Sequence, residues 1–192
     1  MPLSRALPTL VFALTVATGL PAQAILRAAP STRATSEVAL SYPEGQAPAD
    51  AKPLAIRLDF GQPHLRGRAM HTDSLVPYDK PWRTGANAAT RLTTDVDFVL
   101  GGATLAKGTY VLFTLPSRAG WKLIIQKDGP RPEVNYEAAN DIARVDLHSR
   151  QLAEPVESLT LSLIPVAGPG AARGELRISW GTFAVSTDWS VK

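Results

Sequence analysis

The sequence predicts an all-β fold, an antiparallel β-sandwich of roughly eight or nine strands with at most a short helical crossover. Short runs in which apolar and polar residues alternate recur along the chain. Turn residues separate these runs, and no apolar-periodic helix exceeds about ten residues. The turn signals are Gly101-Gly102, Pro116-Ser117, Asp128-Gly129-Pro130 and Gly168-Pro169-Gly170.

Residues 1–24 have the organisation of a secretory signal peptide. A single Arg5 precedes an apolar run from Leu10 to Leu20, and the small-x-small segment Ala22-Gln23-Ala24 follows. The run of about 11 apolar residues covers about 16 Å as a helix, against about 30 Å of membrane hydrocarbon. We therefore expect cleavage after Ala24, no membrane span, and a periplasmic or secreted protein.

Residues 25–53 are rich in Ala, Pro, Ser and Thr and read as a linker, because they hold few large apolar side chains to offset chain entropy. One segment within the linker differs from the rest. Over residues 37–42 the apolar side chains Val38, Leu40 and Tyr42 alternate with other residues, which favours an added edge strand.

Residues 54–190 are predicted to form a single β-sandwich domain. In the first strand, Leu54, Ile56, Leu58 and Phe60 point to one face. The in-facing positions of Trp121 and Trp180 indicate core packing. A single helical turn is expected at residues 135–141 as a crossover between sheets. Further strands are expected at 110–115, 121–126, 142–147, 158–163, 175–180 and 183–187.

Composition excludes several classes of function. The chain has 192 residues, 45% of them hydrophobic, which is enough for one core. It has no cysteine, which rules out disulfides, thiolate metal sites, a cysteine nucleophile and a lipid on an N-terminal cysteine. Removal of residues 1–24 leaves 19 basic against 17 acidic side chains, a net charge of +2. With no basic run longer than Arg66-Gly67-Arg68, nucleic-acid binding is not expected.

The segment LVPYDKPWRTGANAATRL, residues 75–92, is the first candidate binding element. Pro77 and Pro81 fix the backbone and remove two amide donors, so this segment should be a loop. A loop of one fixed shape on a rigid scaffold is a typical place for binding residues. The candidate ligand contacts are Tyr78, Trp82, Arg83 and Asn87. Alternatively, Trp82 plugs the end of the sandwich while Arg83 and Asn87 satisfy turn carbonyls.

A second candidate binding element, rich in basic side chains, lies just upstream. If residues 64–70 are extended, His64, Arg66 and Arg68 share one face. Residues 54–92 contain six basic and three acidic side chains, which suits an anionic or polyhydroxyl ligand. The alternative is a solvated strand face without a ligand.

Catalytic, cofactor and metal signals are weak. The sequence has no G-x-S-x-G, no phosphate-binding glycine loop and no S-x-x-K, and no cofactor is expected. His64 and His71 with Asp73 or Asp79 are conceivable zinc ligands, but no HExxH or third nearby histidine supports them. No metal site and no catalytic residue is therefore predicted.

Several stretches together resemble a known family: FGQPHLRGR, residues 75–92, GGATLAKGTYVLFTLP, WKLIIQKD, YEAANDIARVDL and ELRISWGTFAVS. They are similar to the bacterial "domain of unknown function 2911" family (DUF2911) over residues 54–185. The resemblance implies an exported, compact, largely β domain and no established activity. It places Trp82, Arg83, Gly85 and Asn87 in the family's most recognisable segment.

Three functions follow as hypotheses. The first is a non-catalytic periplasmic module that binds a small polar or anionic ligand, a glycan or an envelope protein through the loop and the cationic strand, with Trp82 partly exposed. The second is a periplasmic hydrolase acting on envelope or extracellular polymers, with His64 or His71 beside a carboxylate. The third is assembly through an exposed strand edge at residues 37–42.

Overall fold

The computed structural model describes residues 25–128 and 135–192, so the predicted signal peptide lies outside the described residues. The regular secondary structure of the described chain is almost entirely antiparallel β-sheet, which confirms the predicted fold class. One 3₁₀ turn, η1 (Ala138–Asn140), lies inside the predicted crossover. The strands are β1 (Arg33–Leu40), β2 (Leu54–Gly61), β3 (Thr90–Thr94), β4 (Phe98–Leu100), β5 (Ala103–Leu105), β6 (Gly108–Pro116), β7 (Trp121–Lys127), β8 (Asp141–Pro165) and β9 (Arg173–Val191).

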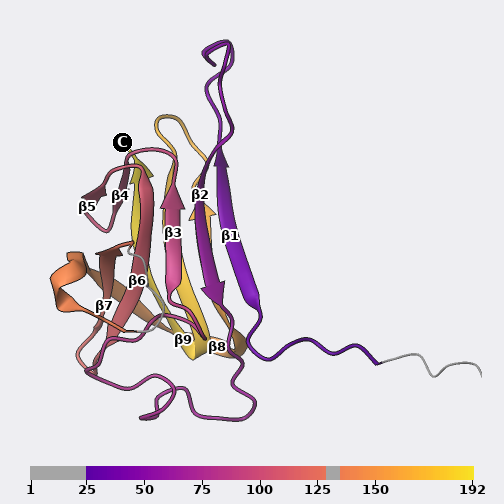
Figure 1. The fold of residues 1–192 in the computed structure, drawn as a ribbon, viewed down its shortest axis with the longest axis vertical. Coiled ribbons are helices and arrows are strands. Elements are labelled where there is room, and N and C mark those ends of the chain that lie inside the picture. The colour runs from indigo at the N-terminus through magenta and orange to yellow at the C-terminus, as the bar shows by residue number, and fades with distance from the viewer. Residues whose placement is uncertain (1–24, 129–134) are drawn as a thin grey trace, which may run out of the picture.

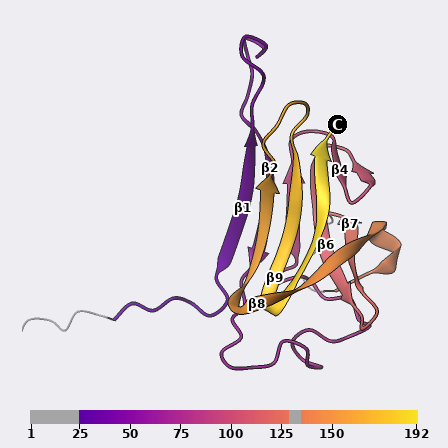
Figure 2. The ribbon, with the colours of Figure 1, turned by 180° about the vertical axis from the view of Figure 1, so that it is seen from behind.

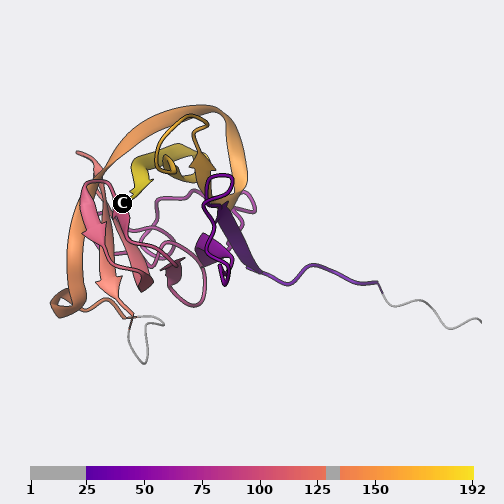
Figure 3. The same cartoon turned by 90° about the horizontal axis from the view of Figure 1, so that it is seen from above.

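The nine strands form one sheet in the order β1-β2-β3-β6-β7-β8-β9-β4-β5. This sheet folds over on itself into two layers. In Figure 1, β1, β2, β3, β6 and β7 form the near layer, and Figure 2 shows the later part of β8 with β9 on the other side. β8 belongs to both layers, because residues 141–147 pair with β7 and residues from 148 onward pair with β9. Seen from above, β8 sweeps across from one layer to the other (Figure 3).

The continuity of β8 and β9 differs from the prediction. We expected separate runs at 142–147 and 158–163, and again at 175–180 and 183–187, but each pair is one long strand. The pairing of β8 with β9 shifts register on both sides of Val156, and such bulges bend a strand. In β9, Gly181 has a φ of +60°, a conformation that glycine adopts without steric cost. Bends within β8 and β9 therefore join the runs that we expected to be separate strands.

The core lies between the two layers, as the two-residue alternation requires. In β2, Ile56, Leu58 and Phe60 are buried while Arg57 is exposed. Trp121 and Trp180 are both buried, which confirms their predicted core positions. A smaller cluster occupies the opposite face of β6 and β7 and contains Ala89, Val111, Phe113 and Ile124.

β1 brings part of the predicted linker into the sheet. It pairs with β2 along its whole length, from Arg33 opposite Gly61 to Leu40 opposite Leu54. The edge strand predicted at residues 37–42 therefore exists, but it begins at Arg33 and ends at Leu40. On its other side, Ser36 Oγ accepts a hydrogen bond from the backbone N–H of Leu163 in β8 at 2.9 Å. Residues 41–53 form an exposed loop that extends beyond the sandwich (Figure 1).

Candidate functional site

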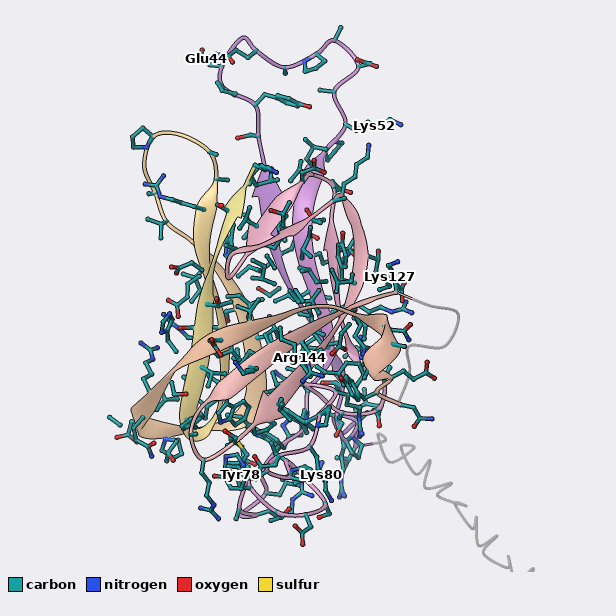
Figure 4. All side chains as sticks on the ribbon, turned by 90° about the vertical axis from the view of Figure 1, so that its left-hand side faces the viewer. Glu44, Lys52, Tyr78, Lys80, Lys127 and Arg144 are labelled. Carbon is teal, nitrogen blue, oxygen red and sulfur yellow. The ribbon has the colours of Figure 1, made fainter. Side chains whose placement is uncertain are left out.

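The long connection between β2 and β3, residues 62–89, covers one end of the sandwich. Figure 4 shows Tyr78 and Lys80 of this connection at one end of the molecule, with Glu44 and Lys52 at the other. Where the connection meets the β6–β7 turn and the bends of β8 and β9, it leaves an open cavity of about 580 Å³. We call this cavity the aromatic cleft; its main residues are Arg68, His71, Tyr78, Arg118, Trp121 and Phe183.

Backbone hydrogen bonds fasten the connection at both ends. Near its start, the N–H of Leu65 donates to Glu157 at 2.9 Å, and the N–H of Leu159 donates to Pro63 at 3.0 Å. Near its end, Trp82 and Thr114 of β6 exchange a pair of hydrogen bonds at 2.7 and 2.8 Å. Both ends of the connection are therefore held against the sandwich. Within the connection, His64 and Trp82 are the residues that form isolated β-bridges.

Four residues of the connection that are not glycine have a positive φ: Arg66 at 52°, Asp79 at 59°, Thr84 at 56° and Asn87 at 63°. For a β-branched residue such as Thr84 this conformation is strained, and strain persists only where the surroundings hold it. Thr84 is buried, and its carbonyl accepts a hydrogen bond from Thr90 Oγ1 at 2.8 Å. The connection is therefore held in one particular shape.

His71 stands at the centre of the ring contacts in the aromatic cleft. Its imidazole stacks on the ring of Tyr78 with centroids 4.1 Å apart and planes 16° apart. It presents an edge to Trp121 at 5.7 Å and to Phe183 at 6.5 Å. Trp121 and Phe183 also contact each other at 5.4 Å. The four rings form a continuous aromatic lining, in arrangements that aromatic pairs favour.

The protonation state of His71 follows from its surroundings. Burial lowers the pKa of His71 below its usual value of 6.5. The hydrogen bond to Val76 opposes this shift, and the charge of Arg118 adds to it. The ring is therefore mainly neutral at pH 7. Nδ1 of His71 donates to the carbonyl of Val76 at 3.2 Å, which leaves Nε2 with a lone pair that can accept a hydrogen bond.

The charged groups of the cleft are all cationic. The guanidinium of Arg118 lies 4.8 Å from the centre of the Tyr78 ring, within the range of a cation–π contact. Arg68 is oriented by the carbonyls of Leu65 and His64, which accept hydrogen bonds from its Nε at 2.9 Å and its Nη2 at 2.7 Å. No aspartate or glutamate is among the described residues that line the cleft. The cleft is thus an aromatic surface with two positive charges.

A second hollow of about 440 Å³ lies on the other side of the β6–β7 turn. It shares Ser117 and Trp121 with the aromatic cleft. We call it the side groove; its other residues include Asp79, Leu115, Ala119, Lys122, Asp146 and Leu147. Lys122 Nζ forms an ion pair with Asp146 across β7 and β8. The turn between the two hollows is closed by the hydroxyl of Ser117, which donates to the carbonyl of Gly120 at 2.7 Å.

The structure brings two predicted binding residues, Tyr78 and Arg68, into the cleft. Trp82 is not partly exposed, so that expectation was wrong. Only 7% of its surface is accessible, and its indole stacks on Trp180 at 5.9 Å with planes 9° apart. Because the indole fills the space between the layers, Trp82 acts as the plug that we considered as the alternative.

Arg83 and Asn87 do not line the cleft. Arg83 is half-buried, and its Nε has no hydrogen-bond partner among the described residues. Asn87 is exposed, and its Nδ2 lies 3.4 Å from the carbonyl of Ser31, to which it donates. Neither residue is therefore in contact with the ring cluster around His71.

The strand considered for residues 64–70 does not form. After a single bridge between His64 and Ser158, the chain turns, and Arg66 and Gly67 both adopt positive φ angles. His64 Nδ1 lies within hydrogen-bond distance of Ser158 Oγ at 2.7 Å, while Arg66 is exposed and its backbone N–H donates to Glu157 Oε1. His64, Arg66 and Arg68 consequently do not share a strand face, and of the three only Arg68 lines the cleft.

Four members of the cleft were not predicted as binding residues. His71 was considered only as a metal ligand or base, Trp121 was assigned to the core, and Phe183 was placed in a strand. Arg118 was not selected, although it lies in the turn between the two clearest strands, at the same end as the connection. A turn residue at the end of two strong strands is a signal that would have found it.

Among residues 25–128 and 135–192, no group of three or more His, Asp or Glu is close enough to hold a metal ion. None of the ion pairs in this part of the chain includes a histidine. The nearest polar partners of His64 and His71 are a hydroxyl and a backbone carbonyl.

The fold and the cleft define an all-β sandwich with an aromatic, cationic hollow at one end of its layers. Residues 43–188 match the family described as "Protein of unknown function (DUF2911)". Because the match covers more than half of the chain, the chain belongs to this family, which confirms the resemblance. No curated protein and no solved structure matches the chain. In the described part of the chain, no helix is long and apolar enough to cross a membrane.

Proposed function

We propose that this protein is an exported, non-catalytic binding module whose aromatic cleft takes a small anionic ligand with a flat apolar face. The proposal of export to the periplasm or the medium rests on the pattern of residues 1–24. Binding rests on one observation, the convergence of four rings and two arginines in one open cleft with no carboxylate in its lining.

The chemistry of the cleft supports this class of ligand. The rings that line the cleft offer apolar area, and Arg118 and Arg68 offer guanidinium groups that pair with carboxylate or phosphate. Ligand pockets of small molecules are commonly 300–1,000 Å³, lined by aromatic side chains with few polar groups. The volume of about 580 Å³ falls in that range.

A hydrolase has less support from the geometry. A general base is a proton acceptor of suitable pKa that lies within hydrogen-bond reach of the proton it removes. The imidazoles of His64 and His71 contact Ser158 and Val76, and neither has a described carboxylate as an ion-pair partner. We therefore place binding before catalysis.

The test compares four small molecules by isothermal titration calorimetry with the purified protein. Glucuronate and benzoate combine a carboxylate with a flat apolar face, whereas glucose lacks the charge and inorganic phosphate lacks the face. We expect glucuronate or benzoate to bind, and glucose and phosphate to bind at least about 10-fold more weakly, because a charge-assisted hydrogen bond contributes about 1.5–3 kcal/mol. Equal or absent binding of all four would contradict the proposal.

Two variants locate the binding. Arg118→Ala removes the cation over Tyr78 and should weaken binding by about 10-fold or more. Lys52→Ala removes one positive charge at the opposite end of the molecule (Figure 4) and should leave affinity unchanged. Equal loss in both variants would mean that net charge, and not the cleft, attracts the ligand.

Export has a separate measurement. Expression of the full chain in a bacterial host, followed by fractionation and N-terminal sequencing, should yield a periplasmic or secreted protein that begins at Ile25. An intact N-terminus in the cytoplasmic fraction would contradict the proposed export.

A further inference from the structure

The two hollows at this end of the sandwich have opposite charge character. The aromatic cleft contains Arg68 and Arg118 and no described carboxylate. The side groove contains Asp79, and Asp146 paired with Lys122, so its lining carries one more negative than positive charge. A ligand that extends from one hollow into the other therefore meets a cationic compartment first and an acidic compartment second.

The hollows are neighbours on either side of one short turn. They share Ser117 and Trp121, so the indole lies against both. The ridge between them is the turn at residues 117–120, and its members Ala119 and Gly120 are small and exposed. An elongated ligand can thus cross the turn at Ala119 and Gly120, beside the side chain of Arg118, which extends over the Tyr78 ring in the cleft.

The hydrogen-bonding groups favour hydroxyl donors on the ligand. In the cleft, Nε2 of His71 is an acceptor because Nδ1 carries the proton toward Val76. In the side groove, the carboxylates of Asp79 and Asp146 are acceptors, and 82% of the side-chain surface of Asp146 is exposed. Acceptors beside Leu115, Leu147 and Trp121 suit a ring that has hydroxyl groups at its rim and apolar faces.

We infer that the ligand is an acidic oligosaccharide, with a uronic acid unit in the aromatic cleft and an adjoining neutral sugar unit in the side groove. This inference rests on the proposed binding function and specifies its ligand class. The charges of the two hollows determine which sugar unit lies in which hollow. A carboxylate pairs with the arginines of the cleft, whereas a second carboxylate in the side groove would be repelled by Asp79 and Asp146.

Calorimetry with four sugars tests this order on the purified protein. The probes are glucuronate, a disaccharide of glucuronate linked to a neutral hexose, a disaccharide of two uronic acids, and the neutral disaccharide cellobiose. We expect the mixed disaccharide to bind at least 10-fold more tightly than glucuronate. The diuronate should bind no more tightly than glucuronate, and cellobiose more weakly than all three.

A charge variant of the side groove provides a matched control. Asp146→Asn preserves size but removes the charge that pairs with Lys122, so the groove lining becomes less acidic. In this variant glucuronate should bind as in the unmodified protein, while the diuronate should gain affinity by about 5-fold or more. Ala119→Gln, which enlarges the ridge, should remove the advantage of the mixed disaccharide and leave glucuronate binding unchanged.

The outcomes separate the two proposals. If only benzoate binds, if glucuronate binds and the mixed disaccharide is no tighter, or if the diuronate is the tightest probe, the inference is overturned and the binding function stands. The sugar assignment is also overturned if the dipeptide Glu-Ala binds as tightly as the mixed disaccharide. If neither glucuronate nor benzoate binds, the binding function itself fails, and the inference fails with it.

Discussion

Replacement of Trp82 by alanine tests whether this side chain is a structural plug at the end of the sandwich. Trp82 is 7% exposed and stacks on Trp180. A buried tryptophan removes about 200 Å² from water, and at about 25 cal/mol per Å² this area corresponds to about 5 kcal/mol. Because unfolded chains already bury part of such area, we expect the free energy of unfolding to fall by about 3–4 kcal/mol.

Urea unfolding followed by circular dichroism measures this loss as a lower midpoint with an unchanged slope. At about 2–4 °C per kcal/mol for a chain of this size, the melting temperature should fall by about 6–16 °C. Tyr42→Ala, in the exposed loop at residues 41–53, is the control and should change stability by less than about 0.5 kcal/mol. A loss below about 1 kcal/mol for Trp82→Ala would refute its role as a structural plug.

Three other predictions concern packing and pH. Gly174→Ala should lower stability by about 1–3 kcal/mol in urea, because the added Cβ would clash with the backbone carbonyl of Ile164 and lie 2.7 Å from the Trp189 ring, and unchanged stability would contradict this packing. Burial holds the pKa of His71 below 6.5, so below this pH the unfolded chain binds more protons than the folded chain. Stability should therefore fall as the pH drops below 6.5. His71→Phe should make the melting temperature depend less on pH in thermal scans. Burial alone raises the pKa of Asp141, but hydrogen bonds, including the one from Tyr136, hold this pKa below its usual value of 3.8. Tyr136→Phe removes one of these bonds and should therefore move the midpoint of acid unfolding to higher pH. An unmoved midpoint would contradict this role of Tyr136.

The strands that the sequence predicts best are those in which alternation is strong and turn residues flank both ends. β2, β6 and β7 meet both conditions, and each was placed within a few residues. β3 was missed because Thr90–Thr94 contains a single large apolar residue, Leu92, and its strand conformation depends on pairing with β2 and β6. β4 and β5 have three residues each, too few to show a period.

The site was only partly predictable because its parts are distant in sequence. The two prolines correctly indicated a loop, but they carry no information about which of its side chains turn inward. Trp82 is enclosed by its stack on Trp180, a partner that only the folding of the two layers brings near. Trp121 and Phe183 have the alternation of core residues, yet they lie at the end of the layers, where they also line the cleft.

The hydrogen bond between Ser36 and Leu163 bears on how the protein behaves in a crowded solution. The free edge of β1 and the free edge of β8 face each other, as Figure 2 shows, so each shields the other from strands of other molecules. A neighbouring molecule would have to separate the two before it could add a strand there. Loss of residues 25–40 would uncover both β2 and β8, and such a truncated chain should form fibrous aggregates where the intact protein stays dispersed.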